Sequence, residues 1–353
     1  MQDATRFWSK GLQELAPYVP GEQPQGGGWI KLNTNENPYP PSPAAIAAMH
    51  EALGSRMPMY PDPNCSDFRK AVAEREGLDV GQVFAGNGSD EVLYFAFLAF
   101  FRRGGELVFP DLTYSFYPVY ARATGVPFRT VRLDDEFRIP MDEMVSTESG
   151  VIFPNPNAPT TVKVPLDAVE AVLRRNPDSV VVVDEAYVDF GADTATPLIG
   201  EHPNLLVVQT LSKSRSLAGL RVGWAMGDRG LIDALERVRD SINSYTVDRV
   251  AQFGAAAAIR DEAYFRETCA KVVATRERFA AGLERLGFSL PPSSANFVFA
   301  AHPTLSAAEL LAALREHKIL IRAFRGPRLE RHARISIGTD EEMDAVLEAL
   351  EHL

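Results

Sequence analysis

The composition of this 353-residue chain is that of a globular protein, with 46% apolar and 24% charged residues. Its net charge of −11 argues against binding to nucleic acid or anionic membranes, because both need a clustered basic surface. The two cysteines, Cys65 and Cys269, show no disulfide or metal-ligand spacing, so we expect neither a disulfide framework nor a metal site. Because signal-peptide layout and membrane-length apolar segments are both missing, we expect a cytoplasmic protein.

The middle of the chain alternates short apolar segments with amphipathic ones, which predicts strands and helices in turn. Helices are expected over residues 44–53, 65–76, 91–101, 117–123, 166–174 and 231–238. Strands are expected over residues 83–85, 106–109, 127–130, 150–153, 180–183, 205–209 and 222–226. Buried β-branched strands that alternate with helices indicate a mostly parallel, seven-stranded α/β sheet.

The rhythm changes near residue 260, where a long helix over residues 261–286 is predicted, ending before Gly287. Strands over residues 296–300, 319–321 and 333–337, with helices over 307–316 and from 340, indicate a small α+β domain. We therefore predict an N-terminal arm over residues 1–40, a large domain over 41–260 and a small domain over 261–353.

Lys213 stands just beyond the strand predicted over residues 205–209, in a turn rich in threonine and serine. Ligands bind beyond the carboxyl ends of the strands in open α/β sheets. A lysine at such a place can form a Schiff base if desolvation and nearby cations lower its pKa. Thr210, Ser212 and Arg221 can donate hydrogen bonds to a phosphate. A single lysine of this kind is usually a surface residue, but the whole string is far more specific.

Asp184 and Tyr187 follow the four valines of residues 180–183, at the end of another predicted strand. An enzyme that uses pyridoxal 5′-phosphate (PLP) needs an anion beside the pyridine nitrogen, and Asp184 can supply it. Tyr187 can bond the phenolic oxygen of the same ring. Either residue could instead be structural, Asp184 as a helix cap and Tyr187 as part of the core.

The turn at residues 86–90 joins a predicted strand to a helix, and its free amides suit a phosphate. It contains Gly88, Ser89 and Asp90 but fits neither a P-loop nor the dinucleotide fingerprint, which disfavours a Rossmann dehydrogenase. Tyr114 follows the strand predicted over residues 106–109 and can stack on a flat ring. Both features also have plain structural readings, as a helix cap and a core aromatic residue.

Together these strands bring a phosphate-binding turn, an aromatic ring, an anion and a lysine to one edge of the sheet. The residues resemble the fold type I PLP enzymes, and within them the class-II aminotransferases, over nearly the whole chain. Residues 15–23, 31–39 and 60–63 are similar in particular to segments of the histidinol-phosphate aminotransferases.

The resemblance implies that Lys213 binds PLP as a Schiff base and moves a proton between substrate and cofactor. Asp184 is expected to pair with the ring nitrogen, Tyr187 to hold the ring oxygen and Tyr114 to stack on the ring. The implied phosphate contacts come from Gly88, Ser89, Asp90, Thr210, Ser212, Arg221 and, from the partner subunit of a homodimer, Tyr60. The implied substrate contacts are Tyr18, Asn35, Arg322 and Arg334.

One departure from the family pattern concerns the ring oxygen. Many relatives have Asn-Asn-Pro-Thr-Gly where this chain has Asn-Ala-Pro-Thr-Thr at residues 157–161. Ala158 therefore stands where an asparagine is expected, and Asn157 or Asn155 must serve instead. We favour Asn157, because a shift of one residue in a turn can restore the contact.

The predicted reaction is ping-pong transamination of L-histidinol phosphate with 2-oxoglutarate, giving imidazole-acetol phosphate and glutamate in histidine biosynthesis. An aromatic amino acid aminotransferase and a PLP-dependent decarboxylase of phosphorylated threonine are the alternatives within this fold. A non-catalytic protein that binds phosphorylated ligands is disfavoured by the combination of Lys213 with Asp184.

Overall fold

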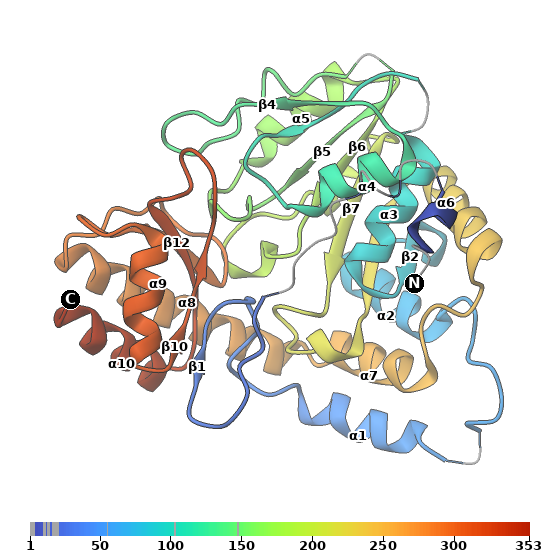
Figure 1. Ribbon diagram of the computed structural model, residues 1–353. Coiled ribbons are helices and arrows are strands. Elements are labelled where there is room, and N and C mark those ends of the chain that lie inside the picture. Colours follow the sequence, from blue (N-terminus) through green and yellow to red (C-terminus); the bar gives the residue numbers. More distant parts are fainter. Residues whose placement is uncertain are drawn as a thin grey trace.

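A seven-stranded sheet forms the centre of the computed structural model, which describes residues 4–9, 12, 15, 21–54, 56–101, 104–146 and 148–353 (Figure 1). Its strands, in spatial order, are β2 (Val83–Gly86), β8 (Gly223–Gly227), β7 (Leu205–Thr210), β6 (Val180–Asp184), β5 (Gly150–Pro154), β3 (Leu107–Pro110) and β4 (Phe128–Val131). Only β8 runs antiparallel to its neighbours in this sheet. The predicted mostly parallel sheet is confirmed.

Helices cover both faces of this sheet, which explains why its strands are apolar on both sides. Along β6, Val182 packs into one apolar cluster, whereas Val181 and Val183 pack into the other, because successive side chains alternate between faces. The face with Val182 is covered by α3 (Gly88–Phe100), α4 (Phe116–Thr124) and α6 (Arg229–Ile242). The opposite face is covered by α2 (Ser66–Glu76), α5 (Leu166–Arg175) and α7 (Arg249–Arg260), with α1 (Pro43–Ala52) packed on α7.

A second, antiparallel sheet of three strands lies apart from the first and has its own apolar cluster (Figure 1). Its order is β11 (Arg322–Ala323), β12 (His332–Ser336) and β9 (Phe297–Ala301). Its helices are α8 (Glu262–Arg285), α9 (Ala307–Glu316) and α10 (Asp340–Glu351). The long helix predicted over residues 261–286 is α8, and Asp261 caps it by accepting a hydrogen bond from the backbone of Tyr264.

The N-terminal segment joins this second cluster. β1 (Ile30–Lys31) pairs in parallel with β10 (Ile319–Leu320), and Leu32 is buried among the residues of the same cluster. The strand predicted over residues 319–321 is therefore wrong in extent: the chain changes partner after Leu320, from β1 to β12. The domain limits at residues 40 and 260 stay predictions.

Short 3-10 helices occupy several connections: η1 (Ala4–Phe7), η3 (Val80–Gln82), η4 (Val188–Phe190), η5 (Thr196–Leu198) and η6 (Ala218–Leu220). None of the helices in the described part of the chain combines the length and apolar character needed to cross a bilayer.

Candidate active site

A cavity of about 150 Å³ lies beyond the carboxyl ends of β6 and β7, where the sequence places its candidate residues. Most of the predicted site residues line it: Asn35, Ser89, Asp90, Tyr114, Asp184, Tyr187, Thr210, Ser212, Lys213, Arg221 and Arg334. The predicted Gly88, Asn157, Arg322 and Tyr60 do not line this cavity, and Tyr18 lies outside the described residues.

Lys213 occupies the loop that follows β7 and reaches into the cavity. Its Nζ donates a hydrogen bond to the backbone oxygen of Thr34, 3.2 Å away, and lies 5.7 Å from the centre of the Tyr187 ring. The Asn37 side chain donates to the backbone oxygen of Lys213 at 3.0 Å. The lysine is therefore held at its backbone by Asn37, and its amine is placed by the hydrogen bond to Thr34.

Asp184 is a buried carboxylate with only partial compensation for its charge. The Tyr117 hydroxyl donates to its Oδ2 at 2.8 Å, and the backbone of Ala186 donates to Oδ1 at 3.3 Å. Burial raises the pKa of Asp184 to about 6, and these hydrogen bonds oppose the rise. A cation in the cavity would stabilise the ionised form, which is what the ring nitrogen of the predicted cofactor requires.

Arg221 anchors the side of the cavity where the phosphate is expected. Its Nη2 lies 3.0 Å from Asp90 Oδ2, and its Nη1 lies 3.4 Å from Ser212 Oγ. The Thr210 hydroxyl donates to Ser212 Oγ at 3.0 Å. Hydroxyls, a guanidinium and the first turn of α3 thus meet at one place, a combination that suits a phosphate.

Gly88 makes this close approach possible. A Cβ at Gly88 would lie 2.5 Å from Arg221 Nη2, and the residue has a φ of +79°. Gly223 has a similar role, because a Cβ there would lie 2.3 Å from the backbone nitrogen of Ser89. Gly88 therefore shapes the turn without lining the cavity itself.

Asp90 accepts hydrogen bonds from three sides, which differs from the predicted phosphate contact. The hydroxyls of Tyr114 and Tyr120 lie 2.6 and 3.3 Å from its Oδ1, and Arg221 occupies Oδ2. Burial, with the Asp90 carboxylate close by, raises the pKa of Tyr114 well above its usual value, so its hydroxyl stays a donor. The Asp90 carboxylate thus orients Arg221 and Tyr114, whereas the Ser89 hydroxyl and the backbone amides of this turn are the groups suited to an anion.

The two candidate asparagines are both engaged elsewhere. Asn155 exchanges hydrogen bonds with the backbone of Val164, at 3.1 and 2.9 Å. The Asn157 amide donates to the backbone oxygen of Leu112 at 2.9 Å and to the Thr160 hydroxyl at 2.8 Å. The cavity is lined at this place by Ala158, whose methyl group can make no hydrogen bond.

The predicted substrate arginines lie on neighbouring strands of the smaller sheet. Arg322 and Arg334 are directly opposite each other in the pairing of β11 with β12. Arg334 lines the lysine cavity, and both arginines line an adjoining cavity of about 410 Å³. Phe109, Phe128 and Phe324 also line the second cavity, which therefore offers both cations and flat apolar surfaces.

Tyr60 lies away from the cavity of its own chain. Its side chain is 77% exposed, and its ring stacks on Tyr245 with the centroids 4.5 Å apart. Its predicted contact with the cofactor of a partner subunit stays a prediction.

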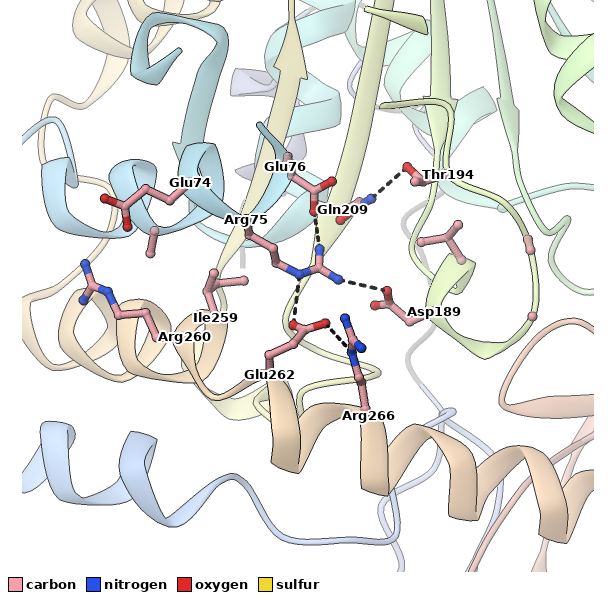
Figure 2. A pocket seen from close by; sticks show the side chains of 14 residues that line it. Glu74, Arg75, Glu76, Asp189, Thr194, Gln209, Ile259, Arg260, Glu262 and Arg266 are labelled. Carbon is pink, nitrogen blue, oxygen red and sulfur yellow. Dashed lines mark hydrogen bonds and ion pairs between the residues drawn. The ribbon is translucent and has the colours of Figure 1, made fainter. Parts of the chain in front are cut away.

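A second cleft, about 730 Å³, lies around Arg75 rather than around Lys213 (Figure 2). Arg75 stands at its centre and points toward Glu76, its neighbour in α2, and toward Asp189 and Glu262, which come from other segments. Arg266 pairs with Glu262 at 3.0 Å. Because these charged side chains already pair with one another, we infer that the cleft has a structural role and is not a ligand site.

A group of two carboxylates and a histidine, the type of side chains that bind cations, also occurs in the described part of the chain. Glu170, Glu201 and His202 each bring a ligand atom within 4.8 Å of the others. However, Glu170 already contacts Arg174 at 2.5 Å and His202 at 3.3 Å, so its charge is satisfied by the protein.

Sequence reasoning missed three residues that shape the site. Tyr117 bonds Asp184, Asn37 holds the Lys213 backbone, and Thr34 accepts from the lysine amine. Tyr117 lies one helical turn after Tyr114, and this spacing was the available signal. Asn37 and Thr34 act over more than 170 residues of sequence, for which no local pattern exists.

A mostly parallel sheet that presents a lysine, a buried carboxylate and a phosphate-type pocket at one edge defines a class of enzymes. The chain belongs to the aminotransferase class I and II family, whose model matches residues 27–350. The predicted fold class is thereby confirmed.

Several individual proteins are similar to this chain over nearly its whole length. The chain is 55% identical to histidinol-phosphate aminotransferase 1 of Bordetella parapertussis, over 99% of both chains. It is 53% identical to histidinol-phosphate aminotransferase 1 of Pseudomonas aeruginosa, again over 99% of both. Among solved structures, the histidinol-phosphate aminotransferase of Sinorhizobium meliloti in complex with pyridoxal-5′-phosphate is similar, with a TM-score of 0.82 and 26% identity over 92% of this chain and 90% of that one.

Proposed function

We propose that this protein is a PLP-dependent aminotransferase that transfers the amino group of L-histidinol phosphate to 2-oxoglutarate, a step of histidine biosynthesis. The proposed substrate rests on one observation, the 55% identity of this chain to a histidinol-phosphate aminotransferase over nearly the full length of both chains. The cavity around Lys213 supports the cofactor and the reaction class independently.

The residues of the cavity fit PLP. Asp184 is a buried carboxylate that a cationic partner would stabilise, and the protonated ring nitrogen of PLP would be such a partner. Arg221, Ser212 and the first turn of α3 offer donors to a phosphate. Tyr114 offers a ring for stacking, while Gly88 leaves the space that a Cβ would fill.

When bound, PLP supplies an electron sink that stabilises negative charge at the substrate α-carbon. The chain's own groups do the rest. Lys213 Nζ would hold the cofactor covalently and, once released, would take the α-proton of the substrate as a general base and deliver it to the cofactor as a general acid. Asp184 keeps the ring nitrogen protonated, while Tyr187 donates to the ring oxygen. The hydrogen bond of 3.2 Å from Lys213 Nζ to the backbone oxygen of Thr34 would be replaced when the amine binds the cofactor.

The substrate's anionic end is assigned to the arginines of the smaller sheet. Arg334 lines both cavities and is the better candidate, with Arg322 beside it on the paired strand. A planar guanidinium pairs with a phosphate monoester or with a carboxylate, as two different substrates require. Asn35 and Tyr18 complete the proposed substrate contacts.

Several further features belong to the same proposal. The protein acts in the cytoplasm as a homodimer, in which Tyr60 reaches the cofactor phosphate of the partner subunit. The exposed ring of Tyr60, outside its own cavity, supports this arrangement. The cavity takes lining residues from all three proposed parts of the chain: Thr34 and Asn35 from the arm over residues 1–40, Lys213 from the domain over 41–260, and Arg334 from the domain over 261–353.

Covalent trapping tests the role of Lys213. Purified protein with PLP should absorb visible light, and borohydride should fix the cofactor to the chain. Lys213→Ala should lose this labelling and at least ~10²-fold in turnover, because it removes the proposed proton-transfer group. Lys163→Ala, which removes a half-exposed lysine near Asp193, should keep both. Labelling retained by Lys213→Ala would contradict the assignment.

A panel of amino donors tests the substrate. Histidinol phosphate with 2-oxoglutarate should give the highest kcat/KM, and phosphate-free histidinol should be much poorer because the arginines lose their anion. A wide preference for an aromatic amino acid would favour the aromatic aminotransferase instead. Carbon dioxide released without any keto acid would favour a decarboxylase of phosphorylated threonine.

A further inference from the structure

The side of the cavity near Ala158 lacks a donor that the family pattern leads one to expect. Of the lining residues that β5, β6 and the loops after them supply, namely Pro154, Ala158, Asp184, Ala186 and Tyr187, only Tyr187 carries a hydrogen-bond donor in its side chain. Asn157 does not replace the missing amide, because its Nδ2 already serves Leu112 and Thr160. The direction of one hydroxyl proton, that of Tyr187, therefore decides whether this side can bond a ring oxygen.

Asn35 contacts that hydroxyl from the opposite end of the chain. Its Nδ2 lies 3.0 Å from the Tyr187 oxygen and donates to it. Asn35 is buried and has a φ of +56°, a conformation that asparagine tolerates better than most residues. Asn296 donates to its backbone oxygen at 3.1 Å, which fixes the segment further.

Ser336 determines which way the Asn35 amide faces. The Asn35 backbone N–H donates to Ser336 Oγ at 2.9 Å, and Ser336 Oγ donates its own proton to Asn35 Oδ1 at 2.9 Å. If the amide were reversed, two N–H groups would point at Ser336 Oγ, and its buried proton would lose this acceptor. The amide therefore presents Nδ2, a donor, to Tyr187.

This arrangement makes the Tyr187 hydroxyl a donor toward the cavity. An oxygen that accepts from Asn35 must direct its proton elsewhere, and the open direction is the cavity that Tyr187 lines. We propose that Asn35 is a positioning residue that aims the Tyr187 proton at the cofactor's ring oxygen, in place of the donor lost at Ala158. The inference rests on the proposed use of PLP and goes beyond the substrate contact expected of Asn35.

The test is the pH dependence of the visible absorption of the PLP-bound protein without substrate. A donor to the ring oxygen stabilises its anionic form and so lowers the midpoint at which the lysine linkage loses its proton. Tyr187→Phe should raise this midpoint by about 0.5–1 pH unit, the size expected for one hydrogen bond. Asn35→Gly, which keeps the positive φ and adds no charge, should raise it by part of that amount.

The decisive comparison is the double variant. With phenylalanine at position 187 there is no proton to aim, so Asn35→Gly should add no further shift. Equal shifts in both backgrounds would overturn the inference.

Two further variants separate a positioning role from a general loss of structure. Ala158→Asn should lower the midpoint of Asn35→Gly toward that of the wild type, because it restores a donor from the other side. Asn33→Ala removes a buried amide two residues away that bonds the backbone of Glu22 and should leave the midpoint unchanged. If the wild type shows neither a visible band nor borohydride labelling, the proposed function fails; if it shows both without the coupling, only this inference fails.

Discussion

Asp184 and Glu185 are consecutive residues whose carboxylates serve different parts of the molecule. Asp184 lines the cavity around Lys213. Glu185 instead accepts hydrogen bonds from Thr194 and Gln209, two residues that line the cleft around Arg75 (Figure 2). Side chains that alternate across the end of a strand explain the separation. Burial raises the pKa of Glu185 to about 7, although its hydrogen bonds oppose the rise.

Glu185 should make the protein less stable as the pH rises. Its carboxyl keeps its proton in the folded chain up to about pH 7 but loses it near pH 4.5 when unfolded. Between these values the folded state binds more protons, so the free energy of unfolding falls with rising pH, by up to roughly 3 kcal/mol for this group. The contribution is present below pH 4.5 and lost by about pH 7.

Glu185→Gln should remove this dependence. The difference in unfolding free energy, wild type minus variant, should decrease between pH 4.5 and 7, as measured by urea denaturation across that range. A difference that stays constant over this range would show that Glu185 is ionised in the folded protein throughout.

At the scale of elements, the loop that carries Lys213 is held from two sides. The Asn37 side chain donates to the backbone oxygen of Lys213, and Asp189, from the segment after β6, accepts from the Ser214 hydroxyl at 2.5 Å. Asp189 also faces Arg75 across the cleft shown in Figure 2, at 4.0 Å. The ion pairs around Arg75 are therefore connected, through Asp189, to the loop that carries Lys213.

Removing Asp189 should loosen the loop and destabilise the fold. Asp189→Ala leaves the buried Ser214 hydroxyl without its acceptor, whereas Arg75 keeps Glu76 and Glu262. We expect a loss of about 1–3 kcal/mol in the free energy of unfolding, from urea denaturation of the PLP-bound protein. Asp193→Ala, which removes a mostly exposed partner of Lys163, should change it by less than about 0.5 kcal/mol. Equal effects of the two variants would show that the loop does not depend on Asp189.

At the scale of the whole molecule, the proposed dimer makes each site depend on two chains. Lys213 and the cavity come from one chain, whereas Tyr60, remote from its own cavity, is proposed to serve the other. A site shared in this way can be assembled from two variants that are each inactive alone.

Mixing Lys213→Ala with Tyr60→Ala tests this sharing. Each mixed dimer holds one complete site, so randomly reassembled chains should recover about one quarter of the wild-type activity. Tyr60→Ala alone should lower the affinity for PLP about ten-fold or more, so the assay is run where only complete sites are saturated. If mixing restores nothing although the chains exchange, as judged by a tag on one of them, Tyr60 does not act across the interface.

The sequence by itself determined all seven strands of the larger sheet and most of its helices, but not α7 (Arg249–Arg260) or β1. Four consecutive valines predict β6, and the positions of Asp184 and Lys213 at the carboxyl ends of β6 and β7 bring them to one edge of a parallel sheet. Local periodicity encodes strands and helices, and parallel strands share their carboxyl edge, so these conclusions need no knowledge of long-range contacts.

Only the tertiary structure decided how those residues are partnered. It shows that Asn155 and Asn157 turn away to other partners, that Asp90 holds Arg221, and that Asn35 meets Tyr187 from 152 residues away. Which donor faces which acceptor depends on how distant segments pack, and residue spacing carries no record of that. The partner of each hydrogen bond at the site is therefore a property of the folded chain.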